Sequence, residues 1–169
     1  MAASQDIQER RLSMFSVNAG VRLLGGLILA LGVTAGTADA DQRQPVKPIS
    51  GSPQVLEGDL LRVGGIPVRL YAIDAPGMKQ TCERKSRRYA CGVVASTGLM
   101  DLTAGLEFVT CEPLGKTADG GIIARCRDPE GFDLSRQMIY TGWAFALPDA
   151  DIKFHQLQQE AQKAKRGMW

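Results

Sequence analysis

Four cysteines are the strongest constraint on what this chain can fold into. They are Cys82, Cys91, Cys111 and Cys126, in a chain of 169 residues. An even number of cysteines in a small chain favours disulfide bonds if the chain reaches an oxidising compartment. Several pairings are possible, and we favour Cys82 with Cys91 and Cys111 with Cys126 because each closes a short loop. Zinc is the weaker interpretation, because no pair has the C-x-x-C spacing of a zinc knuckle.

Residues 1–40 predict an export signal. Three arginines precede an apolar stretch: Arg10, Arg11 and Arg22. The stretch, residues 23–36, is shorter than the roughly 20 residues that a membrane-spanning helix needs. The sequence A-D-A at 38–40 has the small-x-small form of a signal peptidase site. Cleavage after it predicts a periplasmic or secreted protein with no stable membrane association. An uncleaved anchor helix from near Val17 is the alternative, and Met14 is a second candidate start.

The rest of the chain divides into a polar lead, residues 41–53, and one domain, residues 54–169. Hydrophobic residues make up 44% of the chain and charged residues 22%, which is ordinary for a globular domain with a packed core. The formal net charge of +2 is too small to argue by itself for nucleic acid or for a membrane surface. We expect the lead to be flexible and the domain to be a monomer.

Hydrophobic patterning predicts short strands with helices attached. Strands are expected at residues 55–63, 66–73, 106–111 and 121–127, and helices at 90–104, 133–140 and 151–166. Gly64 and Gly65 suit a hairpin turn between the first two strands. Residues 78–89 and 112–119 are expected to be loops. This order fits an α+β fold, mainly β: a five-stranded Greek-key barrel of the OB type with about three helices.

Several motifs follow one another along residues 54–169. They are EGD at 57–59, VRLYAIDAPG at 68–77, QTC with ACG at 80–82 and 90–92, DGGIIARC at 119–126, a D-L…G-W-A pattern at 133–144 and KRGMW at 165–169. Each motif is weak alone, but the set in this order is specific. It resembles the thermonuclease, or staphylococcal-nuclease-like, family, whose catalytic members hydrolyse phosphodiesters with Ca²⁺.

The resemblance implies a set of site residues. Ca²⁺ prefers hard oxygen ligands, and the family's two aspartates and backbone carbonyl correspond to Asp59, Asp74 and Ala75. Arg69 stands where the first of two phosphate-clamping arginines stands. In the alternative, Arg69 pairs with an aspartate and has only a structural role.

Two expected side chains are missing. By resemblance, Gly77 occupies the position of the general-base glutamate, and Gly121 occupies the position of the second arginine. Glycine supplies neither a carboxylate nor a guanidinium, so we expect nuclease activity to be very weak or absent. Glu57 and Leu60 also depart from the usual aspartate and threonine near the metal. Substitute groups remain an alternative: Glu83 or Glu57 as base, and Arg125 or Lys116 as cation.

A basic cluster lies in the loop expected at 78–89. Its members are Lys79, Arg84, Lys85, Arg87 and Arg88. Such a cluster is more often a solvated loop, but it also steers a polyanion such as nucleic acid or acidic polysaccharide. Tyr89 is the one aromatic residue among these charges, so base stacking has little support.

Three functions follow from these features. The first is an exported, non-catalytic module that binds a polyanion or a protein partner. The second is a residual Ca²⁺-dependent nuclease that acts outside the cytoplasm. The third is an accessory role in making an acidic exopolysaccharide, because small exported proteins of this family occur among succinoglycan-type genes.

Overall fold

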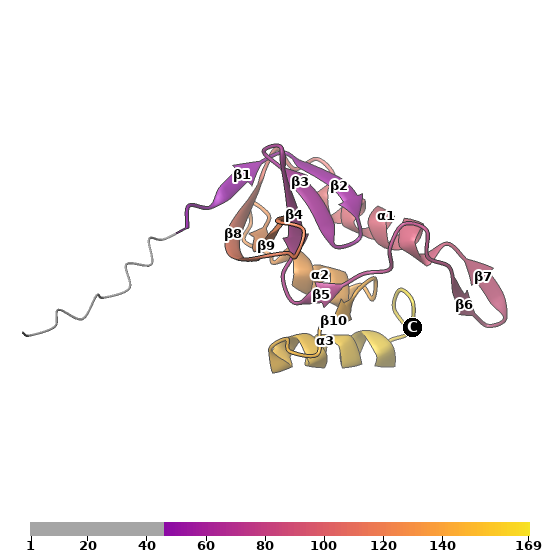
Figure 1. Ribbon diagram of the computed structural model, residues 1–169. Coiled ribbons are helices and arrows are strands. Elements are labelled where there is room, and N and C mark those ends of the chain that lie inside the picture. Colours follow the sequence, from indigo (N-terminus) through magenta and orange to yellow (C-terminus); the bar gives the residue numbers. More distant parts are fainter. Residues whose placement is uncertain (1–45) are drawn as a thin grey trace, which may run out of the picture. The chain divides into compact units, whose positions relative to one another are not determined.

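The computed structural model describes residues 46–169 (Figure 1). The predicted export signal, residues 1–40, lies outside the described residues. None of the helices within residues 46–169 has the length and apolarity of a membrane span.

A six-stranded mixed sheet forms the centre of the domain. In spatial order its strands are β1 (Ile49–Gly51), β8 (Val109–Lys116), β9 (Ile122–Arg127), β4 (Ile66–Leu70), β3 (Leu60–Val63) and β2 (Pro53–Glu57). Only the β4–β9 ladder is parallel, and it sets Arg69 opposite Ile123. The other four ladders of this sheet are antiparallel.

The two edges of this sheet are consecutive pieces of chain. Ser52 alone separates β1, which pairs with β8, from β2, which pairs with β3. The α+β class, mainly strands with three helices, is confirmed. The prediction was a five-stranded Greek-key barrel. In residues 46–169 the main sheet instead has six strands, and no ladder of hydrogen bonds joins its two edge strands, β1 and β2. The chain bends at Ser52 because one stretch serves both edges.

Several predicted boundaries were wrong. The expected strand at 55–63 is two strands, because the chain reverses at Gly58, where an added Cβ would lie 2.9 Å from the Cβ atoms of Ala75 and Ala95. Residues 41–53 were predicted to be a flexible lead, but β1 and the first residue of β2 fall within them. Backbone pairing with β8 outweighs the local polarity of that segment. The strand expected at 106–111 starts later, and β8 continues through the polar residues assigned to a loop.

The basic loop expected at 78–89 contains a β-hairpin. Its strands are β6 (Cys82–Arg84) and β7 (Arg87–Tyr89). Lys85 and Ser86 make the turn with φ values of 49° and 62°. These left-handed conformations match the twist of a two-residue hairpin, but glycine or asparagine usually signals them in a sequence.

Three helices pack around the sheet close to where the sequence predicts them. They are α1 (Cys91–Thr103), α2 (Leu134–Tyr140) and α3 (Ile152–Lys163). Asp133 and Asp151 cap α2 and α3, accepting hydrogen bonds from the backbone N–H groups of Arg136 and Lys153. A small second sheet pairs β5 (Ile73–Asp74) with β10 (Phe145–Ala146).

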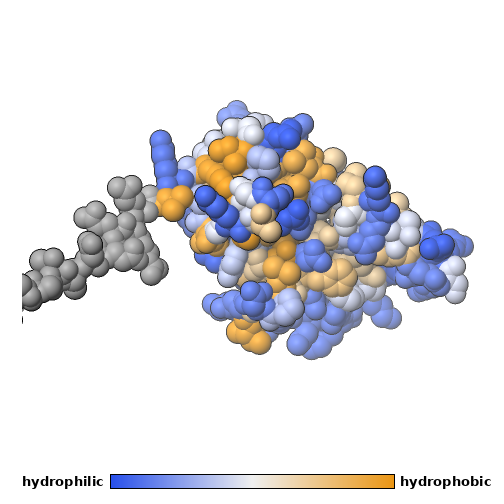
Figure 2. All heavy atoms as spheres, in the orientation of Figure 1, coloured by the Kyte–Doolittle hydropathy of each residue, from blue (hydrophilic) through white to orange (hydrophobic). Residues whose placement is uncertain are grey.

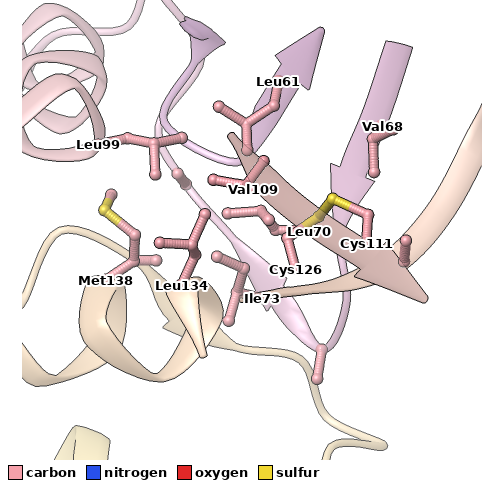
Figure 3. Packing of buried hydrophobic residues seen from close by; sticks show 14 of the residues in the cluster. Leu61, Val68, Leu70, Ile73, Leu99, Val109, Cys111, Cys126, Leu134 and Met138 are labelled. Carbon is pink, nitrogen blue, oxygen red and sulfur yellow. A yellow bond between two sulfur atoms is a disulfide. The ribbon is translucent and has the colours of Figure 1, made fainter. Parts of the chain in front are cut away.

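The core lies between the sheet and the first two helices. Figure 3 shows Leu99 of α1 and Leu134 and Met138 of α2 facing the buried side chains of the strands. Those strand residues include Leu61, Val68, Leu70 and Val109. On the face drawn in Figure 2, hydrophilic side chains surround smaller apolar patches.

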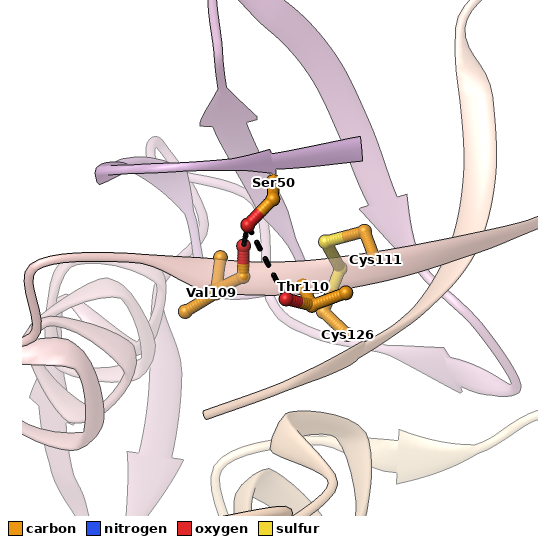
Figure 4. The surroundings of a disulfide bond; sticks show 5 residues. All are labelled: Ser50, Val109, Thr110, Cys111 and Cys126. Atoms are coloured by element: carbon orange, nitrogen blue, oxygen red, sulfur yellow. Dashed lines mark hydrogen bonds between the residues drawn. A yellow bond between two sulfur atoms is a disulfide. The ribbon is translucent and has the colours of Figure 1, made fainter. Parts of the chain in front are cut away.

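Both favoured disulfides are present. The bond between Cys82 and Cys91 ties β6 to the first residue of α1. Cys111 and Cys126 face each other across the β8–β9 ladder and are fully buried. Figure 4 shows Ser50 of β1 beside this second bond, where its hydroxyl donates to the carbonyl oxygen of Val109 at 3.3 Å.

Candidate functional site

The best-defined part of the candidate site is an ion pair between Asp59 and Arg69. Asp59 is the second residue of the β2–β3 turn, and the antiparallel register sets its neighbour Leu60 opposite Arg69 in β4. The guanidinium Nη1 of Arg69 donates to Oδ2 of Asp59 at 2.7 Å. The Asp59 side chain is 3% exposed and that of Arg69 is 38% exposed. Arg69 therefore holds the carboxylate on one side and keeps part of its guanidinium open to solvent.

Burial raises the pKa of Asp59 above its usual value. The positive charge and the hydrogen bond of Arg69 act in the opposite direction, and the charges of Asp74 and Glu57 add to the increase.

Asp74 and Ala75 lie at the end of β5. Asp74 is exposed and pairs through its backbone with Phe145, and Ala75 is buried just before Pro76. Two carboxylates and a carbonyl oxygen are hard donors, so the residues present fit Ca²⁺ in kind. Within residues 46–169 no three acidic, histidine or cysteine side chains converge on one point, so the Ca²⁺ site implied by the resemblance stays a prediction.

Gly77 faces open space. A Cβ built on it would have no atom outside its chain neighbours within 4 Å. Its carbonyl oxygen accepts from the N–H of Gln80 at 2.8 Å. The first turn of α1 packs directly against it, because a Cβ on Gly92 would collide with the Gly77 carbonyl. Gly92 thus fixes the segment that follows Asp74 and Ala75.

Gly121 is more crowded. A Cβ there would lie 2.7 Å from the hydroxyl oxygen of Thr117, which donates to the carboxylate of Asp119. This hydrogen bond lowers the pKa of Asp119, with help from the backbone N–H groups of Asp119 and Gly121 and from the charge of Arg69. The Thr117–Asp119 pair was not singled out from the sequence. It places a carboxylate in the loop where the family resemblance implies a guanidinium.

A small cavity adjoins Arg69. Its volume is about 220 Å³, and it is lined mainly by apolar residues from β4, β8, β9 and the segment after β10. The lining includes Tyr71, Leu114, Ile123, Leu147 and Asp149. We call it the β4 cavity. Tyr71, from the segment between β4 and β5, supplies its aromatic side chain.

The basic cluster does not join this site. Figure 1 shows the β6–β7 hairpin projecting beyond α1, away from β4, which carries Arg69. Arg84 is tied to the end of the chain, because its guanidinium donates to the carbonyl oxygens of Gly167 and Lys165 at 2.9 and 3.4 Å. The other members predicted from the sequence, Lys79, Lys85, Arg87 and Arg88, lie in exposed positions.

Of the substitute groups considered from the sequence, Arg125 is otherwise engaged and Glu83 lies elsewhere, whereas Glu57 and Lys116 stay candidates. Arg125 lies 3.6 Å from a carboxylate oxygen of Asp133 and stacks over the ring of Tyr71. Glu83 belongs to the projecting hairpin. Lys116 ends β8, opposite Ile122.

Comparison with known proteins agrees with these features. The family model for staphylococcal nuclease homologues matches residues 67–169, more than half of the chain. The chain belongs to the staphylococcal nuclease family. All of β4 except Ile66, the β4 cavity and the Gly121 loop fall within the matched region.

Individual relatives of this staphylococcal nuclease domain carry different names. A protein of Rhizobium meliloti (strain 1021) named succinoglycan biosynthesis protein ExoI is 28% identical over 90% of this chain and 78% of its own length. An uncharacterized endonuclease of Escherichia coli is 29% identical over 69% of this chain and 73% of its own length.

Proposed function

We propose that the protein is an exported staphylococcal nuclease domain that binds a polyanion and hydrolyses phosphodiesters weakly or not at all. The observation that carries the proposal is the open space at Gly77, where an added Cβ would have no atom outside its chain neighbours within 4 Å. The pair of disulfides supports export, because such bonds persist in oxidising compartments.

The retained half of the site supports binding over turnover. Arg69 keeps exposed guanidinium surface that can contact a phosphate or carboxylate. Asp59, Asp74 and the carbonyl of Ala75 are the groups that would hold Ca²⁺, which when bound supplies positive charge to stabilise an anionic oxygen. Without a base to orient water and without the second clamp, this charge favours the bound anion but not the transition state.

The β6–β7 hairpin supplies a second area of positive charge. Lys85, Arg87 and Arg88 are exposed on it, and the disulfide to Cys91 anchors it to α1. Clustered cations on an anchored hairpin raise the association rate of a polyanion and make its binding sensitive to salt.

A second candidate function is an accessory role in acidic exopolysaccharide synthesis. It is favoured by the relative named succinoglycan biosynthesis protein, which aligns over most of this chain. Polysaccharide genes beside the gene for this protein would support the role, and their absence would leave it without support.

The test combines binding and cleavage on one sample. We expect the full chain to retard single-stranded DNA in a native gel and to leave it intact with either Ca²⁺ or EDTA. Replacing Lys85, Arg87 and Arg88 with glutamine should weaken the retardation. Rapid Ca²⁺-dependent cleavage that disappears in Asp74→Ala would instead establish an active nuclease and overturn the proposal.

A further inference from the structure

A second and larger groove lies between β9, α2 and α3. Its volume is about 730 Å³, and it shares no lining residue with the β4 cavity. Four cations line it: Arg125, Arg127, Arg136 and Lys153. We call it the α2–α3 groove. None of the motifs that identify the nuclease site requires it.

Three of the four cations are available to a ligand. Arg125 is engaged by Asp133 and by the ring of Tyr71. Within residues 46–169, the side chains of Arg127, Arg136 and Lys153 have no ion-pair or hydrogen-bond partner. They come from β9, α2 and α3 respectively, so three packed elements fix their spacing.

The groove also contains carboxylates and exposed aromatic rings. Asp133 and Asp151 cap α2 and α3 from inside the lining. Phe132 is 58% exposed and Tyr140 is 47% exposed, although the Arg166 guanidinium stacks on the Tyr140 ring at 3.9 Å. A ligand here meets guanidinium and ammonium donors, carboxylate acceptors and an open ring face.

We infer that the α2–α3 groove binds an acidic oligosaccharide. Its carboxylates would pair with Arg127, Arg136 and Lys153, and guanidinium groups hold planar carboxylates with paired hydrogen bonds. Its hydroxyl groups would donate to the carboxylates in the lining, and the apolar face of a sugar ring would cover Phe132. The inference adds a site to the proposed function and holds whether or not the nuclease site is active.

A nucleic acid fits this lining less well. The backbone of single-stranded DNA carries no hydroxyl groups that could donate to Asp133 and Asp151, whereas each sugar of an acidic oligosaccharide does. Sequence-independent binding of single strands also uses a series of stacking rings, whereas only Phe132 presents a largely open face here. The mixture of donors and acceptors matches a polymer that alternates charged and hydroxyl groups.

The groove and the β4 cavity are neighbours along β9. Ile123 lines the cavity, and Arg125 and Arg127 line the groove from the same strand. Tyr71 stands between them, with Arg125 over its ring and Phe154 of the groove packed edge-on at 6.4 Å. An extended chain bound in the groove would therefore continue toward Arg69.

The test is a titration of the full chain with fluorescein-labelled oligogalacturonate, followed by fluorescence anisotropy at low salt. Replacing Arg127, Arg136 and Lys153 with glutamine should weaken binding about tenfold, because partly exposed ion pairs contribute modestly and together. The matched control replaces Lys47, Arg62 and Lys163 with glutamine, three exposed cations that belong neither to the groove lining nor to the hairpin. It removes the same charge from other parts of the surface and should change the affinity less than about twofold.

Phe132→Ala gives a readout that does not depend on charge. It should weaken binding by a factor that persists in high salt, where the ionic contacts are screened. All the changed side chains are at least partly exposed, and thermal unfolding checks that each variant is folded.

Four results would overturn the inference. They are no binding of oligogalacturonate by the unaltered chain, an unchanged affinity in the groove variant, equal losses in the groove and control variants, and tighter binding of oligothymidylate than of oligogalacturonate through the groove residues. DNA cleavage by the unaltered chain would contradict the proposed function and leave this inference standing, so the two fail separately.

Discussion

Restoring the two missing side chains is the most direct test of why this domain should be a poor nuclease. Gly77→Glu introduces a carboxylate into open space, and Gly77 does not have a positive φ, so the change carries no backbone strain. Gly121→Arg is harder, because its Cβ would lie 2.7 Å from the Thr117 hydroxyl oxygen. That contact is with a side chain, so rotation of Thr117 away from Asp119 relieves it.

The expected gain follows from the roles of the two groups. A positioned general base contributes about 10²–10⁴-fold, and a transition-state arginine about 10³–10⁵-fold in related phosphoryl-transfer sites. Such effects do not multiply when the groups act together. We therefore expect the double variant to cleave at least about 10³-fold faster than the unaltered chain. Gly77→Glu alone should give a smaller gain.

The assay follows a single-stranded DNA that carries a fluorophore and a quencher, with Ca²⁺ or with EDTA. Asp74→Ala in the double-variant background controls for contaminating nuclease and should abolish the gain. Adding Thr117→Ala should help if crowding at Gly121 limits the arginine. A folded double variant no faster than the unaltered chain would refute the reasoning, because it would place the defect in Asp59, Arg69 or their geometry.

Three further perturbations follow from the same structure. Because burial raises the pKa of Asp59, its charged form destabilises the fold at every pH above its folded pKa, and this penalty is absent below the ordinary aspartate pKa of 3.8. Asp59→Asn should therefore raise the melting temperature at pH 7 in EDTA, and the advantage should fade in acid; a lower melting temperature at pH 7 would contradict this. Replacing Cys111 and Cys126 with alanine should cost about 3 kcal/mol in denaturant unfolding, from the 15-residue separation of the pair. Gly92→Ala should cost about 1–3 kcal/mol because its methyl group meets the Gly77 backbone, whereas Gly115→Ala, with open space around it, should change stability little.

Local sequence signals predicted the helices better than the strands. Asp133 and Asp151 mark helix starts by side-chain capping, which acts within one turn. The EGD motif at 57–59 marks the reversal at Gly58 only through the family resemblance, because the hydrophobic pattern continues past it and the packing of Ala75 and Ala95 against Gly58 is a long-range contact. The basic hairpin was missed because Lys85 adopts a positive φ in its turn, and a lysine in a sequence does not predict that conformation.

The candidate site also combines features that the sequence predicted with features that only tertiary contacts determine. The Asp59–Arg69 pair was one of the alternatives weighed for Arg69, and strand register explains it. The motifs marked Gly77 and Gly121, but only the structure shows that one has free space and the other faces Thr117. The α2–α3 groove had no sequence signal, since its three free cations come from three elements that tertiary packing brings together.

Ser52, the single residue between β1 and β2, has a consequence for the reduction of the buried disulfide. β1 is only three residues long, and it lies along β8 with Ile49 opposite Cys111. The Cys111–Cys126 bond has no exposed surface, so a reducing agent reaches it only after some covering segment lifts. β1 is the shortest such segment and an edge of the sheet. The rate at which a small thiol reduces this bond would therefore measure how often the first strand detaches while the rest of the domain stays folded.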